Sequence, residues 1–217
     1  MRSLLDEVRG VERRELTSAA RRRRFGRGEV LFHEGDPGDS MHLITKGFVA
    51  IRSTTTLGDI VTLAVLGPGQ TFGELALLTD DATRTATAAA QSDAETLSWR
   101  RAQIEELRRS FPDFDRFLIE VLTAQVERLS ARVVEALRQP VEVRVLRRVS
   151  DLAELYDPSE ACPTIPVTQE DLASLAGTTR PTANRVLKEA EGRGLVALTR
   201  GRIQILDRAG LAKRARE

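Results

Sequence analysis

One stretch of the sequence decides how the whole chain is interpreted: Phe72-Gly73-Glu74-Leu75-Ala76-Leu77-Leu78-Thr79-Asp80-Asp81-Ala82-Thr83-Arg84-Thr85-Ala86. Gly73 lets backbone N–H groups approach a ligand, and the apolar turn that begins at Leu75 directs the positive end of its dipole toward an anion. The Arg84 guanidinium can bind a phosphate through two parallel hydrogen bonds, and the Thr85 hydroxyl can add another. The stretch therefore predicts a compact anion site.

Glu74 indicates that the ligand carries more than a phosphate. In a site for phosphate alone, its carboxylate would repel the anion. The carboxylate is explained if a neutral hydroxyl group, such as a ribose 2′-OH, is bound beside the phosphate. The alternative is a hairpin in which Glu74 pairs with Arg84 at the surface. Such a pair stabilises a fold by roughly 0–1 kcal/mol and implies no function.

This arrangement resembles the phosphate-binding cassette of cyclic-nucleotide-binding domains. The features that match are the Gly-Glu-Leu-Ala run, the ten-residue separation of Glu74 and Arg84, and the hydroxyl residue after the arginine. The resemblance implies that five residues hold the ribose and phosphate of a cyclic nucleotide: Gly73, Glu74, Leu75, Arg84 and Thr85.

Composition limits the class of protein. A chain of 217 residues with 41% hydrophobic residues can form one large or two modest domains with real cores. A net charge of +1 predicts neither a nucleic-acid nor a membrane partner, so any such signal must be local. Cys162, His33 and His42 are the only cysteine and histidines, which excludes an internal disulfide and a ready zinc site. Without a signal-peptide core or a long apolar run, we expect a cytoplasmic protein with no membrane partner.

The region from residue 28 to residue 97 has the pattern of an antiparallel β-sandwich or barrel. Short runs rich in Val, Ile, Thr and Leu alternate with glycine-containing turns. We expect strands at 30–32, 41–45, 48–53, 60–66, 85–90 and 95–99, and we expect both histidines at strand positions. The run of four arginines at 21–24 could bind nucleic acid, but we interpret it as a solvated approach to the first strand.

Helical periodicity follows the β region, first at 101–109 and then in a long helix at 113–138. The long helix carries an apolar stripe: Leu118, Leu122, Val126, Leu129, Val133 and Leu137. At about 1.5 Å per residue it is too long for a small sandwich to cover, so a second copy of the helix is the expected cover. The alternative is a helix packed wholly on its own β domain. Pro140 then ends the helix, which makes 137–139 a joint before a helix at 141–155 and a loop at 156–166.

A helix-turn-helix is the second strong signal. Thr168 caps a first helix, Gly177 makes the turn and Thr179 caps a second helix. Arg180 and Arg185 on the polar face of the second helix are the expected base readers, because arginine matches the guanine O6 and N7 acceptors. A two-stranded wing with Arg200 at its tip follows. The candidate DNA-binding residues are Gln169, Thr179, Arg180, Thr182, Asn184, Arg185, Lys188 and Arg200. The alternative is a helical hairpin with a solvated basic face.

Together the two halves resemble transcriptional regulators of the CRP/FNR family over residues 20–210. The resemblance implies an α+β fold: an antiparallel β-roll in a domain at 1–112, a dimerisation helix and hinge at 113–139, and a winged helix-turn-helix at 140–217. It implies a homodimer that joins through 113–138 and binds a palindromic double-stranded operator, with RNA polymerase as a further partner. It also implies cyclic AMP as allosteric effector.

The chain departs from the family pattern at two positions. Counting from the cassette places the family's adenine-binding residues at Leu129 and Ser130; the serine fits, but an aliphatic leucine cannot hydrogen-bond the adenine amino group. Cyclic AMP, another cyclic nucleotide, and a pocket that no longer controls the protein therefore remain as alternatives. Pro181 replaces a base-contacting glutamate, so one base pair of each half-site should be read loosely.

Two other classes of function are disfavoured. An enzyme would need a paired carboxylate cleft, a Ser/His/Asp set or a metal-ligand cluster, and the sequence contains none of these patterns. A cyclic-nucleotide module that regulates an attached effector would need a catalytic or channel segment. The chain offers only the helix-turn-helix, so we expect a DNA-binding regulator that is not an enzyme.

Overall fold

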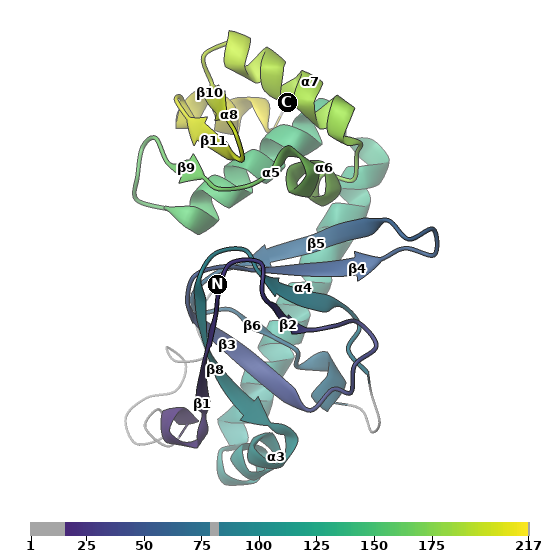
Figure 1. Cartoon of the computed structure of the whole chain (residues 1–217), viewed down its shortest axis with the longest axis vertical. Coiled ribbons are helices and arrows are strands. Elements are labelled where there is room, and N and C mark those ends of the chain that lie inside the picture. Colours follow the sequence, from purple (N-terminus) through teal and green to yellow (C-terminus); the bar gives the residue numbers. More distant parts are fainter. Residues whose placement is uncertain (1–15, 79–82, 217) are drawn as a thin grey trace. The chain divides into compact units, whose positions relative to one another are not determined.

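The computed structural model describes residues 16–78 and 83–216 (Figure 1). The first 15 residues and cassette residues Thr79, Asp80, Asp81 and Ala82 lie outside this description. The chain divides into two compact units. One comprises Met1–Asp59 and Ala64–Arg128, and the other comprises Ile60–Leu63 and Leu129–Glu217.

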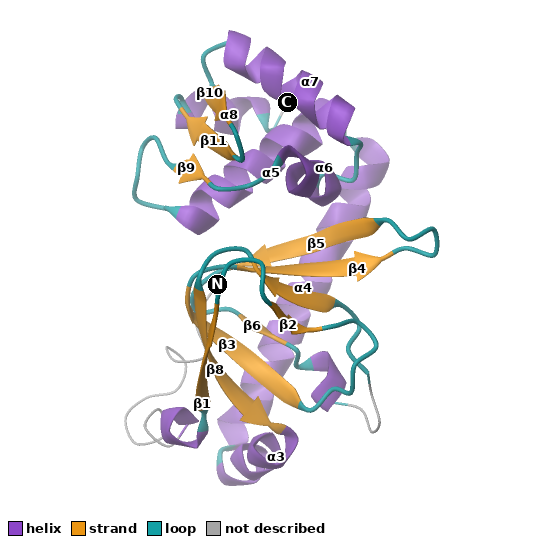
Figure 2. Ribbon diagram, in the orientation of Figure 1, coloured by secondary structure: helices purple, strands orange, loops and turns teal. Residues whose placement is uncertain are grey.

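Two four-stranded antiparallel sheets form the β-rich part of the chain (Figure 2). The first sheet has the order β1-β8-β3-β6 and contains β1 (Arg21–Phe25), β8 (Ala94–Arg100), β3 (Ser40–Lys46) and β6 (Thr71–Phe72). The second has the order β2-β7-β4-β5 and contains β2 (Val30–Phe32), β7 (Thr87–Ala90), β4 (Val49–Thr54) and β5 (Ile60–Leu66). Because β3 lies between β8 and β6, its first five residues are all buried, whereas the first four residues of the edge strand β1 are exposed.

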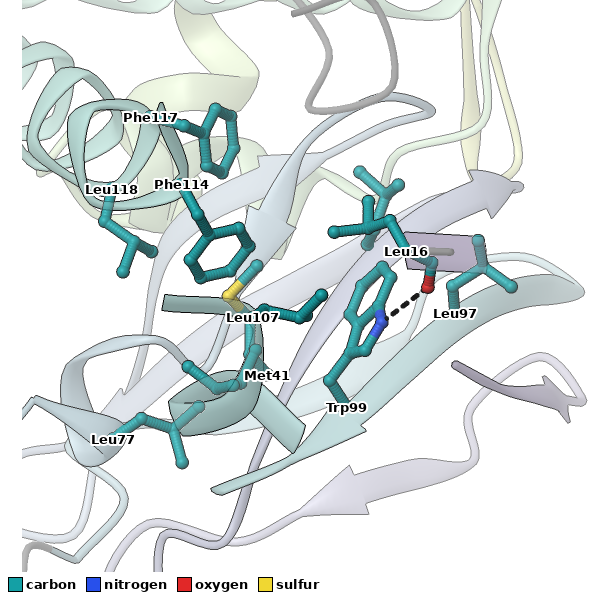
Figure 3. Close-up of a cluster of buried hydrophobic side chains, with 11 residues drawn as sticks. Leu16, Met41, Leu77, Leu97, Trp99, Leu107, Phe114, Phe117 and Leu118 are labelled. Carbon is teal, nitrogen blue, oxygen red and sulfur yellow. Dashed lines mark hydrogen bonds between the residues drawn. The ribbon is translucent and has the colours of Figure 1, made fainter. Parts of the chain in front are cut away.

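Two hydrophobic clusters hold this unit together. In the first, residues from both sheets meet: Phe25, Ile44 and Phe72 from one sheet pack with Val49 and Ala88 from the other. The second cluster packs helices against β3 and β8 around Trp99, which is fully buried (Figure 3). The indole Nε1 of Trp99 donates a hydrogen bond to the Leu16 carbonyl at 2.9 Å, so its only polar atom is satisfied.

Two expectations for the start of the chain are wrong. The arginines at 21–24 form strand β1 itself, because their backbones pair with β8 while their side chains stay exposed. The carboxylate of Glu95 on β8 forms ion pairs with Arg22 and Arg24. His33 follows the end of β2 and is not a strand residue, because its N–H donates to Asp36 Oδ2 at 2.7 Å in a turn.

The expected helices after the β region are present. Helix α3 spans Arg101–Ser110, and α4 spans Pro112–Arg138 as one continuous helix of 27 residues. Near its start, Phe114, Phe117 and Leu118 are buried in the second cluster. Farther along, four stripe residues stay more than half exposed: Val126, Leu129, Val133 and Leu137. The apolar stripe is thus uncovered over this part of the helix.

The helix-rich unit contains α5 (Val141–Tyr156), β9 (Thr164–Ile165), α6 (Gln169–Leu175), α7 (Arg180–Gly192), β10 (Val196–Thr199), β11 (Arg202–Ile205) and α8 (Arg208–Arg214). The two strands expected for the wing form and pair as β10 and β11. What was not expected is that β9 also pairs with β11, which makes a three-stranded sheet in the order β10-β11-β9. Ile165, within the expected loop, is fully buried and anchors this third strand. Helix α8 was not expected; Asp207 caps it and Leu211 anchors it to the core.

Pro140 separates α4 from α5 as its chemistry predicts, since it has no N–H to continue a helix and serves as the N-cap of α5. A buried ion pair lies beside this joint, where Arg148 on α5 donates to Glu135 Oε2 on α4 at 2.6 Å. Arg147 also approaches this carboxylate, at 3.5 Å. A buried pair of this kind favours one geometry, because separating the partners leaves a charge unpaired.

The expected fold class is confirmed: a β-rich N-terminal domain, a long helix and a C-terminal helix-turn-helix. Within residues 16–78 and 83–216, no helix is long and apolar enough to cross a membrane.

Replacing Trp99 with alanine should destabilise the β-rich unit. Deleting a fully buried aromatic ring costs about 3–5 kcal/mol of unfolding free energy, because packing is lost and a cavity remains. Urea denaturation followed by circular dichroism measures the change, since Trp99 is the only tryptophan and its fluorescence disappears with it. Leu57→Ala is the control, because Leu57 is 89% exposed and its loss should change stability by less than about 0.5 kcal/mol. Equal midpoints for the two variants would contradict the description of this core.

Candidate functional site

The Arg84 guanidinium lies inside the β-rich unit and is only 3% exposed. Its Nη1 donates to the Ser40 carbonyl at 2.7 Å and to the Gly73 carbonyl at 3.0 Å. Its Nη2 donates to Ser40 Oγ at 2.9 Å and to Asp39 Oδ1 at 3.4 Å. Burial lowers the pKa of Arg84, and the nearby carboxylates of Asp39, Asp36 and Glu74 oppose that shift. The cation is therefore held in one orientation inside the cassette.

An aromatic ring covers one face of this cation. The Arg84 Cζ atom lies 4.1 Å from the centroid of the Phe32 ring, which is a cation–π contact. The Nε atom of Arg84 is buried and has no hydrogen-bond partner in the described part of the chain. The Nε–H donor of the guanidinium is thus unpaired, although its two Nη atoms make four hydrogen bonds to protein acceptors.

Gly73 has to be glycine at this position. Its φ of +82° lies in the left-handed region, where side chains are strained. A Cβ atom there would lie 2.8 Å from Arg84 Nη1 and 3.0 Å from the Ser40 carbonyl oxygen. The residue therefore lets the cassette backbone contact the buried guanidinium directly, through the Gly73 carbonyl. The predicted approach of backbone N–H groups to a ligand stays a prediction.

Glu74 is also buried, with 5% of its surface exposed. Burial raises the pKa of its carboxyl group, while a hydrogen bond to its own backbone and the charges of Arg128 and Arg84 oppose the increase. Its Oε2 atom has no hydrogen-bond partner within residues 16–78 and 83–216. The alternative of a surface pair is wrong, because neither Glu74 nor Arg84 lies at the surface.

Ser40 connects the cassette arginine to a buried histidine. The Ser40 Oγ atom lies 3.4 Å from His42 Nε2, and His42 Nδ1 lies 3.2 Å from Thr96 Oγ1. The imidazole stacks on the Phe72 ring, with centroids 5.1 Å apart. Burial and the charge of Arg84 lower the pKa of His42 to about 3, so the ring is neutral at physiological pH. Arg84 is therefore the only cation in this group of side chains.

The remaining cassette residues lie at its edge. Leu75 opens the short 3₁₀ turn Leu75–Leu77, for which Glu74 is the N-cap, and its side chain is 38% exposed. The Thr85 side chain is exposed and does not join the hydrogen bonds of Arg84. Leu129 and Ser130 lie on α4, and both are exposed. The structure thus brings Gly73, Glu74 and Arg84 together, with the other predicted residues exposed.

Sequence reasoning missed Phe32, Asp39 and Ser40. These residues precede the cassette by more than thirty positions, and the only local signal was the turn at 35–39, which ends at Asp39. Ser40 contributes a carbonyl, which no side-chain pattern reveals.

The helix-turn-helix forms with the expected caps. The Thr168 side chain accepts from the Asp171 N–H at the start of α6, and the Thr179 side chain accepts from the Thr182 N–H at the start of α7. Gly177 makes the turn with φ +60°. Small buried side chains, Ala173 on α6 and Ala183 on α7, allow the helices to cross closely.

The predicted DNA-binding side chains of α7 differ in how they are held. Arg185 Nη1 pairs with Glu189 at 2.6 Å, and Lys188 Nζ pairs with Glu191 at 2.7 Å. Arg180 opens the helix and is exposed, and it makes no ion pair within the described residues. The first turn of α7 therefore carries the cation that no carboxylate neutralises.

A hollow of about 510 Å³ lies between the start of α6, Arg180 and the wing. Gln169 and Glu170 line it from α6, Arg200 lines it from the turn between β10 and β11, and Arg202 lines it from the start of β11. Three arginines thus surround a concave surface next to α7, which suits contact with nucleic-acid phosphates.

Comparison with known proteins identifies both halves. Residues 22–111 match the family described as "Cyclic nucleotide-binding domain", and residues 143–214 match the "Crp-like helix-turn-helix domain". The chain is 30% identical to the CRP-like cAMP-activated global transcriptional regulator of Mycobacterium tuberculosis, over 88% of this chain and 87% of that protein. The chain belongs to the CRP/FNR family. It is a DNA-binding transcriptional regulator with a cyclic-nucleotide-binding domain, and not an enzyme.

Two further relatives agree with this assignment. The cyclic AMP receptor protein of Thermus thermophilus is 31% identical over 87% of this chain and 85% of its own length. A solved CRP/FNR-family regulator from the same organism superposes with a TM-score of 0.78 at 25% identity, covering 91% of this chain and 99% of that one. In this CRP/FNR regulator the buried cassette and the helix-turn-helix are therefore the two places where function is to be sought.

Gly73→Ala should destabilise the cassette of this regulator by more than the cost of a strained backbone conformation alone. A positive φ costs about 1 kcal/mol or more for a residue with a side chain, and the new Cβ would also collide with Arg84 and Ser40. Gly58→Ala is the matched control, because Gly58 has φ +89° but open space around its Cβ position. Thermal denaturation should show a clearly lower midpoint for the Gly73 variant than for the Gly58 variant. Equal midpoints would show that the close approach has no energetic consequence.

Proposed function

We propose that a cyclic nucleotide bound in the β-rich unit controls DNA binding by this CRP/FNR regulator. The observation that carries the proposal is a pair of buried polar atoms, Glu74 Oε2 and Arg84 Nε, without hydrogen-bond partners in the described part of the chain. Buried polar atoms are nearly always hydrogen-bonded, so an unpaired acceptor and an unpaired donor in one cassette indicate a missing ligand. A ligand with both a hydroxyl group and an anion satisfies both.

The cassette residues fit a ribose cyclic phosphate. Arg84 would hold the phosphate by charge-assisted hydrogen bonds, and Glu74 would accept from the ribose hydroxyl. Gly73 keeps the backbone close enough for N–H groups to face the same ligand. Leu75 and Thr85 would complete the edge of the site.

Cyclic AMP is the effector that we propose. The relatives from Mycobacterium tuberculosis and Thermus thermophilus are both named for cyclic AMP. Ser130 would contact the adenine, whereas Leu129 would provide only an apolar surface. We propose that binding biases the joint at 137–140 and so repositions the recognition helices.

The second candidate is a CRP/FNR regulator that binds DNA without an effector. Two observations favour it: the Nη atoms of Arg84 already have protein acceptors, and Leu129 cannot hydrogen-bond a base. Titration of the purified protein with cyclic AMP and cyclic GMP separates the candidates. Binding of neither nucleotide would select the effector-independent regulator.

For DNA we propose a palindromic duplex bound by a homodimer. Arg180 and Arg185 would read guanines, while Gln169, Thr179, Thr182, Lys188 and Arg200 would contact the backbone. The uncovered apolar stripe of α4 supports dimerisation along residues 113–138. A regulator of this kind would act in the cytoplasm together with RNA polymerase.

Arg84→Ala should weaken cyclic AMP binding by at least about 100-fold, because the charge-assisted contact of the guanidinium with the phosphate, which includes the unpaired Nε–H, is lost. Ligand-free DNA affinity should stay nearly unchanged. Isothermal titration calorimetry measures the first quantity, and fluorescence anisotropy with labelled DNA measures the second. Arg84→Lys keeps the charge but not the bidentate geometry and should retain part of the affinity.

Arg27→Ala is the control for this experiment, because Arg27 is an exposed arginine of the same unit. It should bind cyclic AMP like the unaltered protein. If Arg84→Ala also binds normally, the cassette does not hold the phosphate.

Val133→Glu should shift the protein from dimer to monomer. Val133 is 59% exposed on the apolar stripe of α4, and a dimer seam there would bury the new carboxylate at a cost of several kcal/mol. Sedimentation velocity measures the shift. Ala131→Glu is the control, because Ala131 is exposed on the opposite face of the same helix. Unchanged sedimentation of both variants would place the dimer contact elsewhere or exclude it.

A further inference from the structure

We propose that Asn184 is a specificity-determining residue that reads an adenine in each operator half-site. The proposal rests on the proposed DNA contact of α7 and adds to it a base identity, next to the guanines expected for the arginines. Asn184 lies four residues after Arg180, so it is one turn farther along the same side of the helix. Both side chains would enter the major groove from one side of α7.

The position of Asn184 is not explained by helix stability. It is the only asparagine in 217 residues, and it lies in the middle of a 13-residue helix. Asparagine is a poor helix former, because its side chain competes for backbone hydrogen bonds. An alanine there would stabilise α7, so the amide has to serve something other than the fold.

The carboxamide of Asn184 is available for a ligand. Its polar neighbours on α7 already have partners. Arg185 donates a hydrogen bond to Glu189, Lys188 donates one to Glu191, and the Thr182 and Thr179 hydroxyls are hydrogen-bonded to each other. Asn184 is half-buried and makes no hydrogen bond within residues 16–78 and 83–216. A half-buried side chain with a free donor and a free acceptor is well placed to read a base, because its position is restricted by packing.

The chemistry of the amide selects adenine. In the major groove adenine presents the N7 acceptor beside the N6 amino donor, and the asparagine amide pairs with both. Guanine presents two acceptors there, which suits arginine and leaves the amide oxygen unpaired. Pro181, three residues before Asn184, has no polar group that could compete for the same base.

Asn184→Ala tests the proposal through binding-site selection from random duplexes, done in parallel with the unaltered protein at one salt concentration. The unaltered protein should select an adenine at one position of each half-site, and the variant should lose that preference while keeping the guanine positions. Replacing the selected adenine with 7-deazaadenine removes its N7 acceptor. This replacement should weaken the unaltered protein by about tenfold and leave Asn184→Ala unaffected.

Arg200→Ala is the comparison variant, since loss of a phosphate contact should weaken all sequences alike and reduce the salt dependence. If the selection profile of Asn184→Ala equals that of the unaltered protein, or if all positions weaken equally, the adenine assignment is overturned. If the unaltered protein selects no sequence with or without cyclic AMP, the proposed function itself fails. Because alanine favours the helix, loss of folding does not confuse these outcomes.

Discussion

The burial of one guanidinium, that of Arg84, constrains several separate parts of the β-rich unit at once. A buried charge is destabilising unless hydrogen bonds and neighbouring groups compensate it. Here two backbone carbonyls, a hydroxyl and the Phe32 ring do so, and they come from three separate parts of the chain. This explains why position 73 lacks a side chain. His42 stays neutral because its own burial lowers its pKa, and the charge of Arg84 lowers that pKa further. Within residues 16–78 and 83–216 the compensation is incomplete at Arg84 Nε and Glu74 Oε2, and these are the two atoms that our proposal assigns to the bound nucleotide.

In the helix-rich unit, too, some polar side chains are paired within the protein and others remain available to bind a ligand. Along α7, Arg185 and Lys188 pair with carboxylates of the same helix, whereas Arg180 makes no ion pair and Asn184 makes no hydrogen bond within the described residues. Exposed ion pairs contribute little stability, so their main effect is to concentrate uncompensated positive charge at the start of the helix. Under our proposal, DNA recognition by this family member depends on a few side chains of α7 and not on the bulk charge of +1.

Much of the fold could be predicted from the sequence, because local chemistry determines it. Pro140, Gly177, Thr168 and Thr179 fix helix ends through caps and backbone restrictions, and those ends agree with the structure. The failures concern interactions between distant residues. In the sequence, the arginines of β1 look like a solvated charged run, because nothing local shows that their backbones pair with β8. Likewise, β9 is a strand only because β11 lies beside it. In the site, Glu74 and Arg84 were predictable from their spacing, whereas the Ser40 carbonyl that orients the arginine was not.

The most direct test of the account is a crystal structure of the protein with cyclic AMP. The account predicts a phosphate oxygen within about 3 Å of an Arg84 guanidinium nitrogen and the ribose hydroxyl at a similar distance from the Glu74 carboxylate. The two atoms that lack hydrogen-bond partners in the described part of the chain, Arg84 Nε and Glu74 Oε2, belong to these two groups. A nucleotide bound elsewhere, or a cassette without nucleotide in crystals soaked to saturation, would contradict it.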